Sequence, residues 1–210
     1  RFGYAKTIDK ATFERNKEAA LSESKYVISC MNTDKACIFT DTGRLHLIKF
    51  TDMPFGRFRD KSIPLDNLGN DDSSGENIIH ICSLASIQDS MMLFATKTGM
   101  LKLVKGSEFD VSKRPVAATK LADGDSIIAI CTADNFNQLV LQTENGYFIR
   151  FPMMNIPEMK KTAIGVRGIS LGSGDSVKGW LAGSDRPSGM RRSKSASGGC
   201  DCSGKESGSD

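Results

Sequence analysis

The sequence predicts an all-β protein made of repeated hairpin units that are arranged like the blades of a propeller. One unit recurs along the chain: an apolar β-type run, a turn that contains glycine, and a second run that carries a basic residue. The units follow one another at intervals of roughly 40–50 residues, a spacing typical of propeller blades. We therefore expect about four four-stranded units and no long helix, because only residues 10–21 have helical propensity and their apolar stripe is weak.

The hairpins can be placed from their turns. Glycine supplies the positive φ that a tight hairpin turn needs, and the flanking runs are rich in β-branched and aromatic residues. The first unit, at residues 2–6, contains only the second half of a hairpin. The propeller is therefore expected to be truncated on its N-terminal side. The complete hairpins are expected at residues 36–50, 91–105 and 138–151, and the turn glycines are Gly3, Gly43, Gly99 and Gly146.

A second element recurs between the hairpins. Residues 121–128 resemble residues 171–177, since each segment is a Gly-Asp-Ser turn followed by an apolar run. A looser version ends at residues 77–82, after a loop at 69–76 that is rich in Gly, Asn, Asp and Ser. Each copy is expected to supply a further strand to a blade.

The composition divides the chain into two parts. Residues 1–182 carry the repeats, whereas residues 183–210 consist mainly of Ser, Gly and charged residues. Such a composition cannot bury enough apolar surface to fold, so it predicts a disordered tail. Cys200 and Cys202 form the only close cysteine pair, and without a nearby His or second Cys pair no metal site is expected.

The overall charge excludes little. The formal net charge is +3, so only clustering of charges can indicate a nucleic-acid partner. The first four cysteines stand singly in apolar runs, as expected for reduced thiols of a cytoplasmic protein. No apolar stretch is long enough for a membrane span, and no membrane partner is expected.

Basic residues cluster in the connectors that follow the hairpins. If the blades surround an axis, these connectors fall on one rim, and their charges form a curved stripe that suits the phosphates of bent duplex DNA. Basic residues of the strands are further possible DNA contacts. The predicted connector contacts are Arg57, Arg59, Lys61, Lys113, Arg114, Lys160, Lys161 and Arg167, and the strand contacts are Lys6, Arg44, Lys102 and Arg150.

Two other classes of function compete with DNA binding. A protein-interaction propeller would present an exposed apolar patch in place of a basic rim, and Phe55 and Phe58 hint at one. An independent enzyme would need a nucleophile, a base or a metal set, and no such arrangement is visible. His46 and His80 lie within apolar strand patterns and are expected to be packing residues, so no catalytic residue is predicted.

The third connector resembles a known family. Residues 160–169, followed by Leu171 and Gly174-Asp175, closely resemble a stretch of the C-terminal domain of bacterial type IIA topoisomerase A subunits, those of DNA gyrase and topoisomerase IV. Residues 145–151, 96–102 and 63–68 are similar to the same family. The resemblance covers about residues 1–180.

This resemblance implies a β-pinwheel, in which propeller-like blades exchange strands and duplex DNA lies on a basic rim. It also implies a place in an ATP-dependent, Mg²⁺-using holoenzyme on the bacterial chromosome. The partners would be the ATPase B subunit of a heterotetramer and the N-terminal cleavage domain of the same subunit. The family's catalytic tyrosine follows an arginine directly, and no Arg-Tyr pair or phosphate-binding Gly-Lys loop occurs here. The fragment is thus expected to be non-catalytic and to need no cofactor.

One departure bears on the kind of enzyme. Gyrases carry a glycine-rich box, Gln-Arg-Arg-Gly-Gly-Lys-Gly, after the first Gly-x-x-Lys strand. Here Gly3-Tyr4-Ala5-Lys6 is followed at residues 14–20 by a segment with two glutamates and no glycine. The box is tied in the family to full wrapping of DNA, so its absence favours topoisomerase IV over gyrase.

Overall fold

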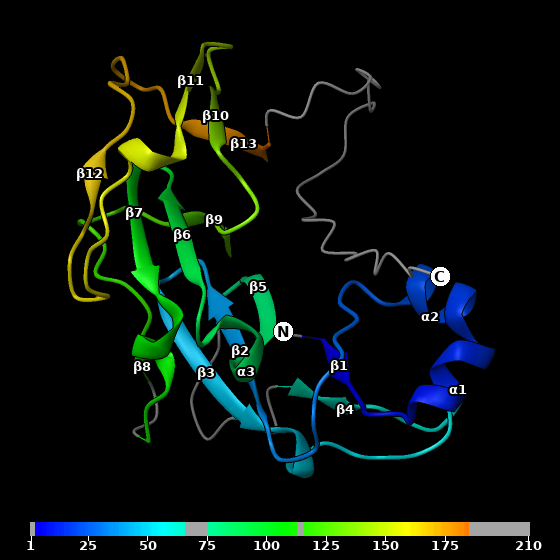
Figure 1. Cartoon of the computed structure of the whole chain (residues 1–210). Coiled ribbons are helices and arrows are strands. Elements are labelled where there is room, and N and C mark those ends of the chain that lie inside the picture. Colours follow the sequence, from blue (N-terminus) through cyan, green and yellow to red (C-terminus); the bar gives the residue numbers. More distant parts are fainter. Residues whose placement is uncertain (1–2, 66–74, 113–115, 185–210) are drawn as a thin grey trace, which may run out of the picture.

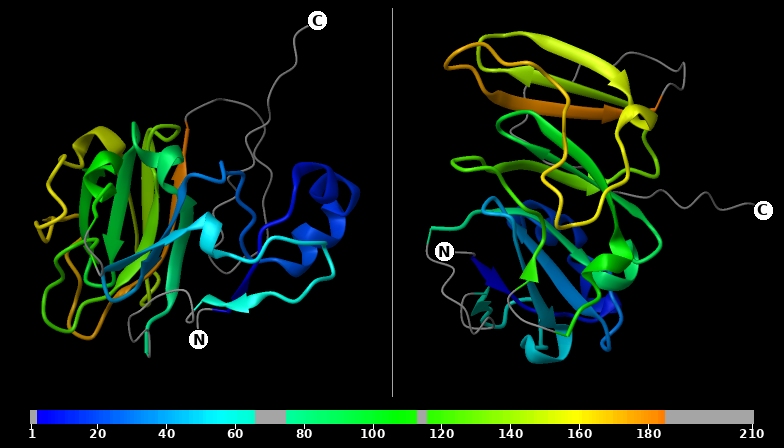
Figure 2. Two further views of the ribbon diagram at one scale, coloured as in Figure 1. Left: turned by 90° about the horizontal axis from the view of Figure 1, so that it is seen from below. Right: turned by 90° about the vertical axis from the view of Figure 1, so that its left-hand side faces the viewer.

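The computed structural model describes residues 3–65, 75–112 and 116–184. Three antiparallel sheets follow one another face to face, and a two-stranded pair with two short helices lies beside the first sheet (Figure 1). The right-hand view of Figure 2 shows the three sheets as successive layers. The expectation of an all-β protein with propeller-like repeats is confirmed.

Each sheet is built around one hairpin, which the turn glycines place where the sequence predicted. In hydrogen-bonding order, the first sheet contains β5, β2 and β3. The second contains β9, β6 and β7, and the third contains β13, β10 and β11. Their bounds are β2 Lys35–Thr40, β3 Arg44–Lys49, β5 Ile78–Ser83, β6 Met91–Thr96, β7 Met100–Lys105, β9 Ile127–Thr132, β10 Gln138–Thr143, β11 Phe148–Pro152 and β13 Val177–Gly183.

The outermost strand of a sheet comes from the following repeat. β4 (Ile63–Pro64) pairs with β1 (Tyr4–Ala5), β8 (Val116–Ala117) pairs with β3, and β12 (Val166–Arg167) pairs with β7. Among the described residues, β11 has no such partner. The connector after each hairpin therefore returns to the blade before it, which is the strand exchange expected of a pinwheel.

The helices are short. The helix expected at residues 10–21 is present as α1 (Lys10–Arg15) and α2 (Lys17–Glu23), which meet at Asn16. Asp9 caps α1, because its carboxylate accepts from the Thr12 amide at 2.8 Å. The remaining elements are α3 (Leu84–Ile87) and the 3₁₀ turns η1 (Phe50–Asp52), η3 (Gly106–Phe109) and η4 (Met153–Asn155). No helix in the described ranges is long and apolar enough to cross a membrane.

The core lies between the sheets. Alternate residues of one strand face opposite neighbours: Phe94 of β6 packs toward the first sheet, whereas Leu93 packs toward the third. Phe39, Phe94 and Phe109 meet between the first and second sheets, with ring centroids 5.2–6.1 Å apart. Because both faces of the middle sheet are covered, β6 is a continuous apolar run rather than an alternating one.

The two recurring sequence elements meet at the hairpin turns. Gly3, Gly43, Gly99 and Gly146 all have positive φ, as predicted. Asp125 accepts from the amide of Thr98 at 3.0 Å, and Asp175 accepts from the amide of Asn145 at 3.1 Å. Each Gly-Asp-Ser turn thus closes the hairpin of its own blade.

Two turn glycines provide a test of the strand exchange. Gly99 and Gly146 have nearly the same φ, +82° and +86°, so alanine should strain either turn by about 1 kcal/mol. A Cβ at Gly99 would also lie 2.6 Å from Ile169, which follows the exchanged strand β12, whereas a Cβ at Gly146 would meet nothing within 4 Å. We expect Gly99→Ala to lower the free energy of unfolding by about 1–3 kcal/mol more than Gly146→Ala, as overpacking does. Equal losses in urea titrations would contradict this packing.

Candidate nucleic-acid interface

The three connectors, residues 50–64, 106–117 and 153–167, share one register on the preceding blade. Ile63, Val116 and Val166 pair with Ala5, Leu45 and Leu101, each of which stands two places after a turn glycine. Counted back from these pairs, Arg57, Asp110 and Lys160 occupy the same position of the three connectors. The connectors can therefore be compared residue by residue.

In the first connector all three predicted residues are exposed. Arg57, Arg59 and Lys61 project from the loop that precedes β4. The amide of Arg57 donates to the carboxylate of Asp60 at 2.6 Å, which fixes the turn at this point. Phe55 is 69% exposed, whereas Phe58 is half-buried beneath the Lys6 ammonium group.

In the third connector the predicted residues differ in their surroundings. Lys160 is exposed, and Arg167 is exposed on β12. Lys161 is half-buried, its ammonium group donates to the Glu108 carbonyl at 2.8 Å, and its amide donates to the Glu108 carboxylate at 2.9 Å. Lys160 and Arg167 therefore keep an exposed charge, whereas Lys161 is held by η3.

The second connector departs from the other two. Asp110 stands where Arg57 and Lys160 stand, and Lys35 of β2 lies 3.4 Å from its carboxylate. Lys113 and Arg114 lie outside the described residues, so they stay a sequence prediction. The stripe of basic residues expected from the sequence is thus interrupted by one carboxylate.

Two of the predicted strand contacts hold the connectors from inside. The Lys6 ammonium group donates to the carbonyl of Phe58 and, at 3.2 Å, to that of Asp60. The Lys102 ammonium group donates to the carbonyls of Lys161 at 3.0 Å and Ala163 at 2.7 Å, with Lys160 at 3.4 Å. These acceptors occupy the same register positions in the two connectors.

Lys102 is removed from the candidate interface by its burial. It is 1% exposed, and its ammonium group lies 5.6 Å from the centre of the Phe94 ring. Desolvation lowers its pKa to about 8, and the charge of Glu108 opposes that shift. The expectation that Lys102 contacts DNA does not fit this position, because a buried ammonium group that is bonded to carbonyls cannot reach a phosphate.

The other two strand residues are exposed. Arg44 lies 3.1 Å from the carboxylate of Glu76, and Arg150 donates to the Gln138 side chain at 3.3 Å. Glu76 is buried and also lies 2.9 Å from Nε2 of His46, which occupies the strand position of Lys6 and Lys102. The charge of Arg44 is therefore partly neutralised within the first blade.

Nothing among the described side chains suggests a metal centre. No group of three or more His, Cys, Asp or Glu residues is placed to hold an ion there. His46 pairs with Glu76, and burial lowers the pKa of His80 to about 4. His46 therefore has a buried polar partner, and His80 is neutral at physiological pH.

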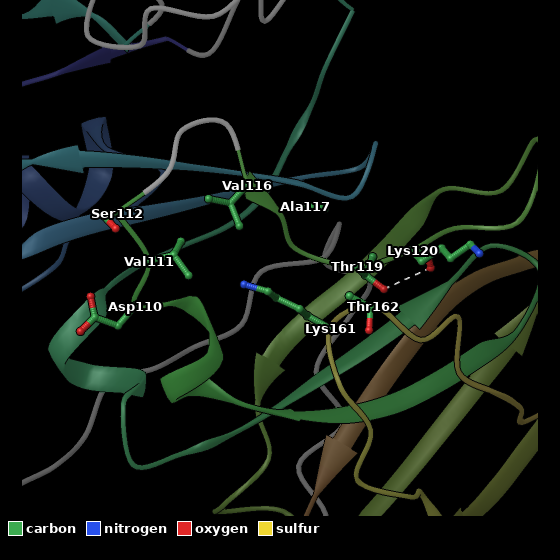
Figure 3. Close-up of a pocket in the computed structure, with 9 residues that line it drawn as sticks. All are labelled: Asp110, Val111, Ser112, Val116, Ala117, Thr119, Lys120, Lys161 and Thr162. Atoms are coloured by element: carbon green, nitrogen blue, oxygen red, sulfur yellow. Dashed lines mark hydrogen bonds between the residues drawn. The ribbon is translucent and has the colours of Figure 1, made fainter.

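An open cleft of about 820 Å³ lies between the second and third connectors (Figure 3). Val111, Val116 and Ala117 line one side, and Lys161 points into it from the other. Lys161 also bonds to Glu108 of the second connector, so the two connectors touch. The structure therefore brings the second and third connectors together, through contacts of Lys161 with Glu108.

Sequence reasoning missed Asp110, Glu108 and the role of Lys102. Asp110 could have been found by counting from Val116, had the exchanged strand been recognised. Glu108 and Lys102 form hydrogen bonds with backbone atoms of a connector more than 50 residues away, and no local sequence pattern predicts such contacts.

Comparisons with known proteins agree with this architecture. Residues 90–130 and 137–182 match the family described as DNA gyrase C-terminal domain, beta-propeller. The chain is 32% identical over 162 residues to the DNA gyrase A protein of Chlamydia pneumoniae, which covers 76% of the chain and 19% of that protein. It is 30% identical over 189 residues to the DNA gyrase A protein of Lawsonia intracellularis, and the match covers 84% of this chain and 23% of that protein. The chain spans about a fifth of the length of these relatives.

Solved structures share the fold. The C-terminal domain of DNA topoisomerase IV superposes with a TM-score of 0.72 at 22% identity, over 86% of this chain and 58% of that one. The DNA gyrase A C-terminal domain superposes with a TM-score of 0.53 at 20% identity, over 73% of this chain and 49% of that one. These structures show the shared fold, and the family match and the relatives at 30–32% identity show that the chain belongs to the family of C-terminal β-propeller domains of type IIA topoisomerase A subunits.

Proposed function

We propose that the chain binds and bends duplex DNA along its connectors without carrying out chemistry itself. One observation supports this most: Arg57 and Lys160 are exposed at the same register position of two connectors, each on the outside of the preceding blade. Arg59, Lys61 and Arg167 add exposed charge nearby. Side chains in such a repeated arrangement suit the regular line of phosphates, so the contacts would position DNA without reading its bases.

The remaining proposals concern the protein of which this domain would be a part. In that assembly the N-terminal part of the same subunit would cleave DNA, and a B subunit would hydrolyse ATP with Mg²⁺, in the bacterial cytoplasm at the chromosome. The family of the chain supports this setting. This domain would supply only the surface that holds the duplex.

We further propose that the domain acts as in topoisomerase IV rather than gyrase. The segment at residues 14–20, where a gyrase carries its glycine-rich box, contributes to the helices α1 and α2. A helical segment with two glutamates offers DNA neither the exposed backbone nor the positive charge of such a box. The domain would therefore bend DNA without wrapping it fully.

A protein-interaction role is the second candidate, and one exposed patch favours it. Phe148 is 66% exposed and Leu181 is 68% exposed, and the strand registers place them on one face of the third sheet. No described element covers this face. Loss of a protein partner on Phe148→Ser/Leu181→Ser, with unchanged DNA binding, would favour this role.

DNA binding can be tested at the two equivalent positions. Arg57→Glu/Lys160→Glu should weaken binding to a long linear duplex and reduce the dependence of log affinity on log salt by about 0.9 for each phosphate contact removed. Lys97→Glu/Lys178→Glu changes the net charge equally at exposed sites outside the connectors and should have a smaller effect. Fluorescence anisotropy at several salt concentrations measures both. Equal slopes for the two variants would argue against the connector surface.

The distinction between bending and wrapping predicts a topological result. If the domain only bends DNA, nicked plasmid sealed by ligase in its presence should show little change in linking number. A full wrap fixes a turn of one handedness and would shift the topoisomers with increasing protein. A shift as large as that of a gyrase C-terminal domain, run in parallel on the same gel, would contradict the topoisomerase IV assignment.

A further inference from the structure

Lys6 and Lys102 carry out the same task in two different repeats. Lys102 lies in β7 and Lys6 directly follows β1. Each stands three places after the turn glycine and sends its ammonium group into the connector of the following repeat. The acceptors also correspond: Phe58 and Asp60 in the first connector match Lys161 and Ala163 in the third. The same contact is thus made at equivalent positions of two repeats.

The bonded carbonyls lie directly beside the proposed DNA contacts. Arg57 precedes Phe58, and Lys160 precedes Lys161, so each ammonium group fixes the chain next to an exposed basic side chain. A carboxylate holds the same stretch a second time: Asp60 accepts from the Arg57 amide, and Glu108 accepts from the Lys161 amide. Backbone order at these points is therefore established before any ligand arrives, which reduces the entropic cost of binding.

The second connector supplies the contrast. Its strand position holds His46, which bonds to Glu76. The connector position that is basic in the other repeats holds Asp110. The strand lysine and the exposed basic residue thus occur together for the first and third connectors. For the second connector, His46 and Asp110 stand at these two positions. If the lysine served only the stability of a blade, no link to the charge of the connector would be expected.

From this correspondence we infer that Lys6 and Lys102 are positioning residues. They fix the connector backbone beside Arg57 and Lys160, so that these two side chains are oriented to contact DNA phosphates. The inference rests on the proposed function and adds to it a buried layer of residues that never touch DNA. At this one position the blades then differ: two carry a held basic residue, Arg57 or Lys160, and the one with His46 carries Asp110.

A double-mutant cycle on the full chain tests the inference, with a fluorescein-labelled 30-base-pair duplex as the probe. Lys160→Gln should reduce the salt slope by about 0.9, the value for one phosphate contact. Lys102→Met removes the buried ammonium group and should cause a similar loss in the wild-type background. In the Lys160→Gln background, Lys102→Met should cause no further loss. Lys178→Gln, at an exposed lysine of β13, controls for net charge.

Each other result has a separate meaning. If Lys102→Met lowers affinity by the same factor with and without Lys160, it acts elsewhere, and the positioning role is overturned. If Lys160→Gln and Lys178→Gln both bind DNA like the wild type, the connector is not a DNA contact. This result would contradict the proposed function itself, not only the positioning role. Hydrogen exchange at residues 160–164 should rise in Lys102→Met but not in Lys160→Gln.

The equivalent pair at the other end of the chain guards against misfolding of Lys102→Met. Lys6 is half-buried at the two-stranded pair β1–β4, away from the aromatic core, so Lys6→Met can be combined with Arg57→Gln without disturbing the main sheets. The same non-additivity is expected there. Additive losses in this second cycle would overturn the inference even if Lys102→Met does not fold.

Discussion

The free edge of the second hairpin strand is the constraint on which this structure depends. An edge strand leaves a row of amides and carbonyls without partners, and proteins must cover or pair it. Here β3 and β7 receive a two-residue strand from the following repeat. Each connector must therefore run back across the preceding blade, and this path carries Arg57 and Lys160 to equivalent places on the outside. The position of the candidate interface is a consequence of how the sheets complete their hydrogen bonds.

The hairpins were predictable because their signals are local. Gly43, Gly99 and Gly146 stand between runs of strand-forming residues, and a positive φ at each turn follows from glycine alone. The exchanged strands were not predictable from pattern, because two residues such as Val166 and Arg167 carry no periodicity. Their pairing depends on a partner more than 60 residues earlier in the chain. The resemblance to a known family, not the pattern, supplied the expectation of exchange.

The candidate site divides in the same way. Basic residues in loops can be identified from the sequence. Arg57, Arg59, Lys61 and Lys160 were predicted in this way, and they are exposed. Lys102 was misassigned because a lysine in a strand is normally a surface residue. Only the fold shows that three connector carbonyls surround its ammonium group. The water that Lys102 has lost lowers its pKa, and the three carbonyl dipoles replace part of that water and favour the charged form.

The exchange of strands also determines how the molecule would carry a mechanical load. If a duplex is bound as proposed, it would pull on a connector whose far end pairs with a strand of the neighbouring sheet, so the load on one repeat would be shared by two. For the third connector, that load would pass through the pairing of β12 with β7, where Val166 pairs with Leu101 and Arg167 with Met100. A load applied to one connector would thus be resisted by two blades and not by a single loop.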